Sequence, residues 1–198
     1  MRTFLKRAIG DETPTCGAAS RRGLKAVGFI SLGLLWLLLD VISKQQFADL
    51  TPGTRVAAGV LGLMDLRLVH NTGAAWGMFS GSTFLLGVFS VVTCALVFVY
   101  FLVDLDRVGA LETCGLALVV GGGIGNALDR FLQGYVIDFI EVTFMSFPVF
   151  NVADIGVTCG IVLFVLGLLA GRARDARGRD PEDATGLAHT AASGEEAR

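Results

Sequence analysis

The chain has 198 residues, 53% of them hydrophobic, and its mean hydropathy is +0.66. This composition is too apolar for an ordinary soluble domain. The formal net charge is only −2, and no basic face with stacking aromatic residues supports nucleic-acid binding. The sequence has two histidines and four cysteines without metal-ligand or disulfide spacing, which excludes a histidine-based zinc site.

Apolar runs divide the chain into three parts. A polar, Arg/Lys-containing tail over 1–23 is followed by four apolar runs over about 26–47, 83–103, 111–128 and 150–170. Runs of about 20 apolar residues cross a hydrocarbon core of about 30 Å as helices. We therefore predict a four-helix membrane domain over 24–170. From 171 to 198 the chain is rich in Arg, Asp, Glu, Gly and Ala, which predicts a disordered tail.

Basic residues predict the orientation of these helices. They gather in the N-terminal tail, in the short loop that carries Arg107, and directly after the fourth apolar run. Because cytoplasmic loops carry an excess of Lys and Arg, both termini are expected in the cytoplasm. Segments 48–82 and 129–149 are then extracytoplasmic.

The first extracytoplasmic segment has its own pattern. Apolar and polar residues alternate around Leu66 to Val69, which predicts short strands in a small sheet on the membrane surface. The stretch HNTGAAWG follows, in which Asn71, Thr72 and Gly73 indicate a turn and Trp76 suits a membrane interface. In the third apolar run, clustered glycines allow either close helix packing or a cavity-lining backbone; they are Gly121, Gly122, Gly123 and Gly125.

Two aspartates stand at the edges of apolar stretches, Asp138 in VIDFIEV and Asp154 in FNVADIG. A carboxylate at the bilayer centre costs roughly 2.5–3.5 kcal/mol, so such residues usually face a functional cavity. Two neighbouring carboxylates that share one proton can take separate acid and base roles on a water molecule. Taken singly, Asp154 is equally explained by helix capping, and Asp138 by a solvated loop carboxylate.

Other polar residues accompany this pair. Asn126 and Asn151 can donate and accept at once, and we expect them to contact a substrate backbone. Asp129 and Arg130 leave the third helix together, and we expect Arg130 to pair with a carboxylate and support the loop. Asp40 and Lys44 lie four residues apart on the first helix, which favours a structural ion pair.

The motifs together resemble the lipoprotein signal peptidase (signal peptidase II) family. The resemblance covers roughly 24–170 and is carried by Asp40 with Lys44, NTGAAWG, GNALDR, VIDFI and FNVAD, in that order. It implies an intramembrane aspartyl protease with four membrane helices and a small extracytoplasmic sheet cradle. It also implies a bacterial inner-membrane enzyme that cleaves prolipoproteins just before a diacylglyceryl-modified cysteine.

The resemblance assigns roles to individual residues. Asp138 and Asp154 match the catalytic aspartates, and no metal or organic cofactor is implied. The site-lining or supporting set is expected to comprise Asn71, Gly73, Asn126, Asp129, Arg130, Asn151, Ala153, Asp40 and Lys44. Membrane lipid and the lipidated prolipoprotein are the expected partners, and we expect a monomer.

Two other classes of protein remain compatible with the residues alone. A transporter could use intramembrane carboxylates as proton relays, although it would often contain inverted repeats, which the sequence lacks. A non-catalytic membrane scaffold would leave the polar cluster unexplained. A serine or cysteine nucleophile would need His70 as its base.

Overall fold

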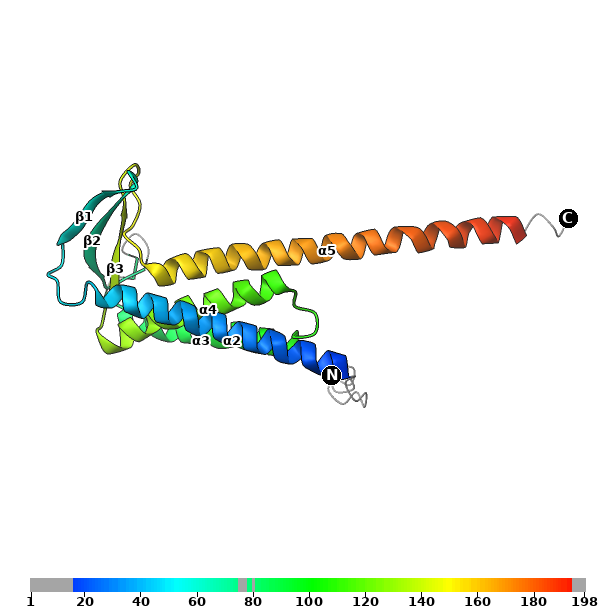
Figure 1. Cartoon of the computed structure of the whole chain (residues 1–198), viewed down its shortest axis with the longest axis horizontal. Coiled ribbons are helices and arrows are strands. Elements are labelled where there is room, and N and C mark those ends of the chain that lie inside the picture. The colour runs from blue at the N-terminus through cyan, green and yellow to red at the C-terminus, as the bar shows by residue number, and fades with distance from the viewer. Residues whose placement is uncertain (1–15, 75–77, 80, 194–198) are drawn as a thin grey trace.

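The computed structural model describes residues 16–74, 78–79 and 81–193, and Figure 1 shows a helix bundle with a small sheet at one end. The four helices are α2 (Cys16–Gln45), α3 (Thr83–Val103), α4 (Ala110–Leu132) and α5 (Val152–Ser193). Each contains a stretch that is long and apolar enough to cross a membrane, over 19–45, 83–103, 110–132 and 152–173. The prediction of four membrane helices is confirmed.

Helix α4 forms the centre of the bundle and packs against the other three helices. Of the most apolar stretch of α4, 67% is buried within the protein. Only 17% of the corresponding stretch of α3 is buried, so most of that helix faces outward. Glycines explain the close packing. A Cβ at Gly121 would lie 2.6 Å from the Gly33 carbonyl oxygen, and one at Gly115 would lie 2.5 Å from the Gly160 carbonyl oxygen. These glycines therefore let the helix backbones approach one another.

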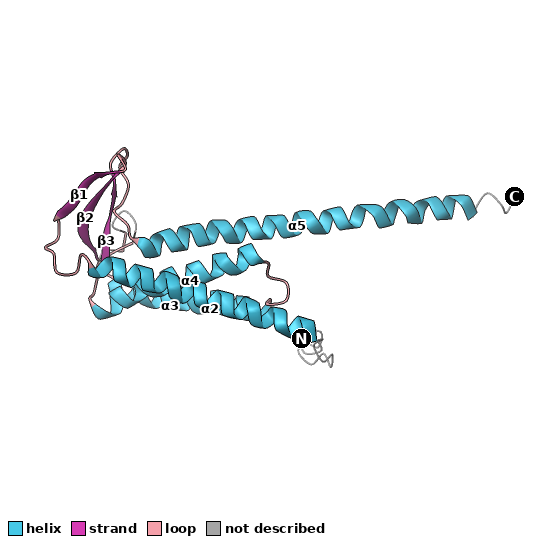
Figure 2. Cartoon of the chain, viewed as in Figure 1, coloured by secondary structure: helices cyan, strands magenta, loops and turns pink. Residues whose placement is uncertain are grey.

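The sheet consists of β1 (Arg55–Val60), β2 (Met64–Asn71) and β3 (Val136–Val142), antiparallel and in that order (Figure 2). The strand expected around Leu66 to Val69 is present as β2. The neighbourhood of Asp138 differs from the expectation, because VIDFIEV is a strand rather than a loop. Its β-branched and aromatic residues favour extended backbone, and the β2–β3 register places Val69 opposite Asp138.

A buried apolar cluster joins the sheet to the end of α2. It contains Phe47, Leu68, Ile137 and Phe139, and the rings of Phe47 and Phe139 stack with centroids 4.4 Å apart. Aromatic stacking of this kind adds to the area that the rings bury. The cluster thus fixes the strand that carries Asp138 against the helix that carries Asp40 and Lys44.

The ends of the chain differ from the sequence prediction. Helix α2 begins at Cys16, inside the expected polar tail, and α5 continues to Ser193, through most of the segment expected to be disordered. Low hydrophobicity predicts a segment without a core of its own, but Ala and Arg also have high helix propensity, so α5 extends beyond its membrane span. Residues 1–15 and 194–198, and Trp76 with its expected interface position, lie outside the described residues.

Candidate active site

Helix α5 begins with a reciprocal pair of hydrogen bonds that involves Asp154. The side-chain oxygen of Asn151 accepts from the Asp154 backbone N–H at 3.0 Å, and the Asp154 Oδ2 accepts from the Asn151 backbone N–H at 3.2 Å. This is the capping-box arrangement, with Asn and Asp in place of the usual Ser and Glu. The capping interpretation of Asp154 is therefore correct, and the cap also fixes the position of its carboxylate.

Asp138 lies on β3 and is buried, with 2% of its surface exposed, so the solvated-loop alternative is wrong. Its Oδ2 accepts from Asn71 Nδ2 at 2.9 Å, and its Oδ1 accepts from Asn151 Nδ2 at 2.7 Å. Burial and then the nearby Asp154 charge raise the pKa of Asp138 to about 7, although the two amide hydrogen bonds oppose this shift.

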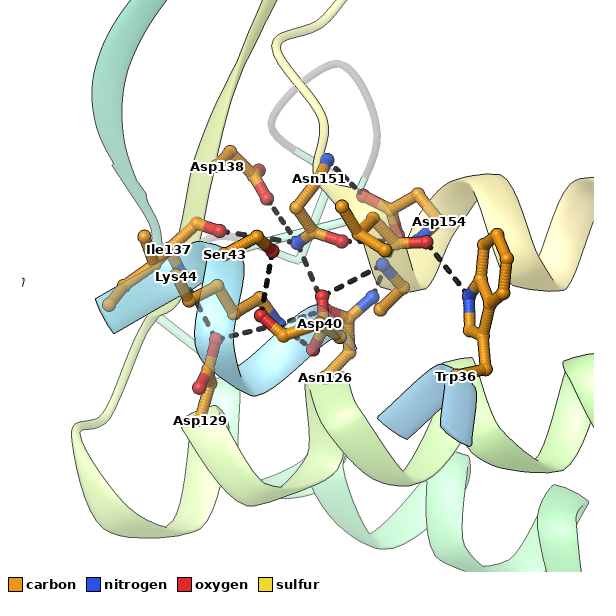
Figure 3. A network of polar contacts seen from close by, with 12 residues as sticks. Trp36, Asp40, Ser43, Lys44, Asn126, Asp129, Ile137, Asp138, Asn151 and Asp154 are labelled. Atoms are coloured by element: carbon orange, nitrogen blue, oxygen red, sulfur yellow. Dashed lines mark hydrogen bonds and ion pairs between the residues drawn. The ribbon is translucent and has the colours of Figure 1, made fainter. Parts of the chain in front are cut away.

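Asn126 and Asn151 connect the two carboxylates to each other (Figure 3). Asn126 Nδ2 donates to Asp154 Oδ1 at 2.7 Å, and Asn151 Nδ2 donates to Asn126 Oδ1 at 3.0 Å. Both asparagines are buried, at 7% and 0% exposure. The amides of both residues hydrogen bond within the protein, and their expected contact with a substrate backbone stays a prediction.

A buried ammonium group lies behind the asparagines. Lys44 Nζ lies 2.7 Å from Asp40 Oδ2, 2.9 Å from Asp129 Oδ2 and 3.0 Å from Asn126 Oδ1. The predicted ion pair between Asp40 and Lys44 is confirmed, and Asp129 is a second partner. Asp40 Oδ1 also accepts from the Ala153 backbone N–H at 2.8 Å. This cluster ties α2 to α4 and to the first turn of α5.

Arg130 does not have the partner that the sequence predicts. Among the described residues it forms no ion pair with a carboxylate; its guanidinium donates to the Asn126 carbonyl at 3.4 Å and the Gly73 carbonyl at 3.5 Å. Gly73 in turn donates its N–H to Asn71 Oδ1 at 2.9 Å, which forms the predicted turn. Arg130 thus supports the turn beside Asp138 by donating a hydrogen bond to the Gly73 carbonyl, and not by pairing with a carboxylate.

A groove opens beside Asp138. Its volume is about 510 Å³, and it lies between β2, the turn at 72–74 and the connection between β3 and α5. Asn71, Gly73, Asp138 and Phe147 are among its lining residues. Asp138 therefore lies at the wall of an open groove.

The sequence-predicted site residues meet at one end of the bundle, at the junction of α2, α4, α5 and the sheet (Figure 3). Trp36 also belongs to this region, although no sequence motif indicated it; its Nε1 donates to the Val152 carbonyl at 3.0 Å. Gly156 provides the space, because a Cβ there would lie 2.5 Å from Trp36 Cδ1. Trp36 lies four residues before Asp40, on the same helix face, which is the signal that could have found it.

Within the described part of the chain, no group of three or more His, Cys, Asp or Glu side chains is placed to hold a metal ion. The site instead offers two carboxylates with different surroundings. Asp138 is buried with a raised pKa, and Asp154 lies in the first turn of a helix, where the helix dipole favours negative charge. Such a pair can hold one proton and one negative charge close together.

The fold and site define a multi-pass membrane protein with an acidic centre at one end of its helix bundle. Residues 32–170 match the family model described as signal peptidase (SPase) II. A lipoprotein signal peptidase of Gloeobacter violaceus is 35% identical over 162 residues, covering 77% of this chain and 92% of that protein. A lipoprotein signal peptidase of Lactobacillus johnsonii is 40% identical over 141 residues, covering 71% and 91%. The chain belongs to the signal peptidase II family and is a membrane peptidase.

Solved structures agree with this assignment. A bacterial membrane enzyme determined at 2.3 Å resolution superposes with a TM-score of 0.67 and 26% sequence identity, covering 74% of this chain and 90% of that one. A second bacterial membrane enzyme, determined at 1.9 Å resolution, gives a TM-score of 0.63 at 26% identity, covering 72% and 92%. The bundle with its small sheet is therefore an architecture already observed in bacterial membrane enzymes.

Proposed function

We propose that this peptidase removes signal peptides from prolipoproteins by cleaving just before a diacylglyceryl-modified cysteine, with Asp138 and Asp154 as its catalytic residues. Family membership supports the substrate class, since the relatives are lipoprotein signal peptidases. One observation carries the aspartyl mechanism: Asn151 hydrogen bonds to both carboxylates, through its side chain to Asp138 and through its backbone to Asp154. A single residue thus holds the two groups in a fixed relation.

The surroundings of the two carboxylates favour one distribution of the proton. Asp138 is buried, and its pKa of about 7 favours the protonated form in neutral solution. Asp154 accepts from Asn126 and from the Asn151 backbone at the start of α5, which fixes the position of its carboxylate. In the proposed mechanism Asp138 therefore supplies the proton and Asp154 acts as the base.

This distribution supports a general acid–base mechanism. The Asp154 carboxylate takes a proton from a water molecule, whose oxygen attacks the scissile carbonyl carbon. The Asp138 carboxyl group donates its proton to the carbonyl oxygen as the tetrahedral intermediate forms. The carbon–nitrogen bond then breaks: the leaving amine takes the proton that Asp154 received, and a hydroxyl of the intermediate returns a proton to Asp138 as the new carboxyl group forms. Both aspartates thereby regain their starting forms, and one water molecule is consumed for each bond cleaved.

The groove and the surrounding helices support a route for the substrate. The peptide lies in the groove beside Asp138, between the turn at 72–74 and the connection at 146–149. The acyl chains remain in the lipid beside the helices, because each CH₂ kept in an apolar environment contributes about 0.8 kcal/mol. The substrate therefore enters laterally from the bilayer. The enzyme acts as a monomer in the bacterial inner membrane, with both termini in the cytoplasm and the site at the outer boundary.

Single substitutions test the aspartyl mechanism. Asp138→Asn and Asp154→Asn nearly preserve side-chain shape but cannot exchange a proton with water, so each is expected to abolish cleavage of a diacylated prolipoprotein in lipid nanodiscs. Asp65→Asn is the matched control, because Asp65 is also buried (7% exposed) but lies on the sheet and pairs with Arg55. Substantial cleavage by a folded Asp138 or Asp154 variant would exclude the mechanism.

Substrate selection is tested with matched peptides. Prolipoprotein peptides with and without the diacylglyceryl group are expected to differ greatly in kcat/KM. Equal values would show that the enzyme reads the peptide alone, and lateral entry through lipid would then be wrong.

A further inference from the structure

One end of the sheet exposes four large apolar side chains. Two belong to the β1–β2 turn, Leu61 (84% exposed) and Leu63 (49%), and two to the connection after β3, Phe144 (68%) and Met145 (52%). The two segments are tied together, since the Thr143 N–H donates to the Leu63 carbonyl at 3.0 Å. We call these four residues the apolar tip. Clustered apolar side chains outside a folded core mark interaction surfaces.

The backbone of Leu61 adds an independent observation. Leu61 has a φ of +53°, and in the described part of the chain the only other non-glycine residue with a positive φ is Phe79, at +57°. Side chains disfavour this conformation, and glycine adopts it freely. The neighbouring Gly59 and Gly62 also have positive φ, yet a leucine stands between them and points its side chain outward. The tip holds an apolar side chain where its own backbone would favour glycine.

The position of the tip relates it to the membrane. In Figure 1 the strands run across the direction of the helices, and the end of the sheet with the β1–β2 turn extends sideways beyond α5, near the level where α5 begins. The candidate membrane spans of α2 and α4 end, and those of α3 and α5 begin, at the end of the bundle that carries the sheet (Figure 1). A lipid leaflet that surrounds the bundle would therefore meet the tip at its interfacial zone, continuous with the surface that the helices already present to lipid.

The charges near the tip are compatible with this contact. Arg67 forms a bidentate pair with Glu141, at 2.8 and 2.7 Å, and Arg55 lies 3.3 Å from Asp65. Each positive group is thus matched by a negative one within the sheet. All four of these charged side chains have a partner of opposite charge. A lipid headgroup layer would therefore not have to compensate any of them.

We propose that the apolar tip inserts into the interfacial zone of the lipid leaflet nearest the site and anchors the sheet there. The connection that carries Phe144 and Met145 continues into Phe147, Pro148 and Val149, which line the groove beside Asp138. The leaflet therefore fixes the depth of one wall of the groove. Contact of the apolar tip with lipid does not depend on the chemistry that the carboxylates perform.

Depth-dependent fluorescence quenching tests the anchor. Single cysteines are introduced as Leu61→Cys, Phe144→Cys and, as a control, Thr51→Cys, in a chain whose native Cys16, Cys94, Cys114 and Cys159 are replaced. Thr51 is exposed and lies in the connection between α2 and β1, away from the tip. Each variant is labelled with an environment-sensitive dye and placed in phosphatidylcholine nanodiscs. Probes at 61 and 144 are expected to be quenched by shallow spin-labelled lipids, and the probe at 51 by aqueous iodide.

Three outcomes would overturn the proposal. Iodide quenching at 61 and 144 equal to that at 51 would place the tip in water. Protection from both quenchers would indicate that protein covers the tip, and quenching only by deeply labelled lipids would indicate burial in the acyl region.

A second variant separates anchoring from folding. Leu61→Gly relaxes the backbone, so we expect an unchanged or higher Tm together with weaker lipid quenching of the probe at 144; unchanged quenching at 144 would also contradict the anchor.

Discussion

The Lys44 ammonium group determines which way the Asn126 amide faces. Lys44 Nζ lies 3.0 Å from Asn126 Oδ1, and Asn126 Nδ2 donates to Asp154 Oδ1 at 2.7 Å. An ammonium group can only donate hydrogen bonds, so it requires the amide oxygen on its own side and turns the NH₂ group toward Asp154. One buried cation thereby orients the group that holds a proposed catalytic carboxylate, without contacting that carboxylate itself.

Replacement of Lys44 is expected to impair both stability and turnover. Lys44→Met leaves the buried Asp40 and Asp129 carboxylates without their cation, and loss of one partner of a buried pair costs about 3–5 kcal/mol. The double variant Asp40→Asn/Lys44→Met removes one of the unpaired charges and should recover part of the thermal stability. Its kcat should stay low, because the Asn126 amide is no longer oriented. Full recovery of kcat together with Tm would limit Lys44 to a structural role.

Activity is expected to fall as pH rises through about 7. Burial, followed by the charge of Asp154, raises the pKa of Asp138 to about 7, while the Asn71 and Asn151 hydrogen bonds and the Lys44 charge oppose the shift. If Asp138 supplies the proton, kcat/KM should decline on the alkaline side of this value. A pH–rate profile with a diacylated peptide measures it. A profile that stays flat from pH 6 to pH 9 would contradict the assignment of the proton to Asp138.

The same pKa predicts how stability depends on pH. Asp138 is protonated more readily in the folded than in the unfolded chain, so the folded state binds more protons between about pH 4 and pH 7. The free energy of unfolding should therefore decrease as pH rises across this window, by up to about 4 kcal/mol. Melting curves across the window measure this decrease, and Asp138→Asn should flatten it.

Arg130→Ala is expected to destabilise the protein only moderately. The lost hydrogen bonds reach the carbonyls of Asn126 and Gly73 at 3.4 and 3.5 Å, and a typical hydrogen bond contributes about 0.5–1.5 kcal/mol. Because the Gly73 turn lines the groove, KM should rise clearly, whereas Tm should fall only slightly. A loss of stability of about 3–5 kcal/mol would instead indicate a buried ion pair. Arg130→Lys keeps the charge but not the planar fork, and it should resemble Arg130→Ala.

Gly122→Ala tests the packing of α4 against the start of α5. A Cβ at Gly122 would contact the Ala153 carbonyl group and lie 3.1 Å from Val157 Cγ2. Overpacking of this kind costs about 1–3 kcal/mol and would displace the turn that carries Asp154, so Tm and kcat should both fall. Gly28→Ala on α2 is the control, because a Cβ there meets nothing within 4 Å. Equal melting temperatures for the two variants would contradict the packing argument.

The proposed topology is tested by labelling. On a cysteine-free background, a cysteine at Thr51, which is exposed, should react with a membrane-impermeant reagent added outside intact cells. A cysteine at Arg107 should react only after the membrane is opened. The reverse pattern would invert the orientation.

The sequence predicts the parts of this structure that depend on local pattern. The apolar runs predicted four helices, and the spacing of Asp40 and Lys44 predicted their pair. Contacts between segments that are distant in the sequence could be identified only from the folded structure. Lys44 meets Asp129 across 85 positions, and Asn71 meets Asp138 through the β2–β3 register, which no local pattern specifies. The contact of Arg130 with the Gly73 carbonyl, 57 positions away in the sequence, likewise depends on the fold.

The cap of α5 makes the acidic centre depend on a helix that follows α2, α3 and α4 in the chain. Asn151 supplies the first hydrogen bonds of α5 and also contacts both carboxylates, and α5 leaves the ribosome after these three helices. A nascent chain that has inserted α2, α3 and α4 therefore carries Asp138 without Asn151 or Asp154. The two carboxylates come together only after α5 has inserted, so under the proposed mechanism a nascent chain without α5 has no peptidase activity.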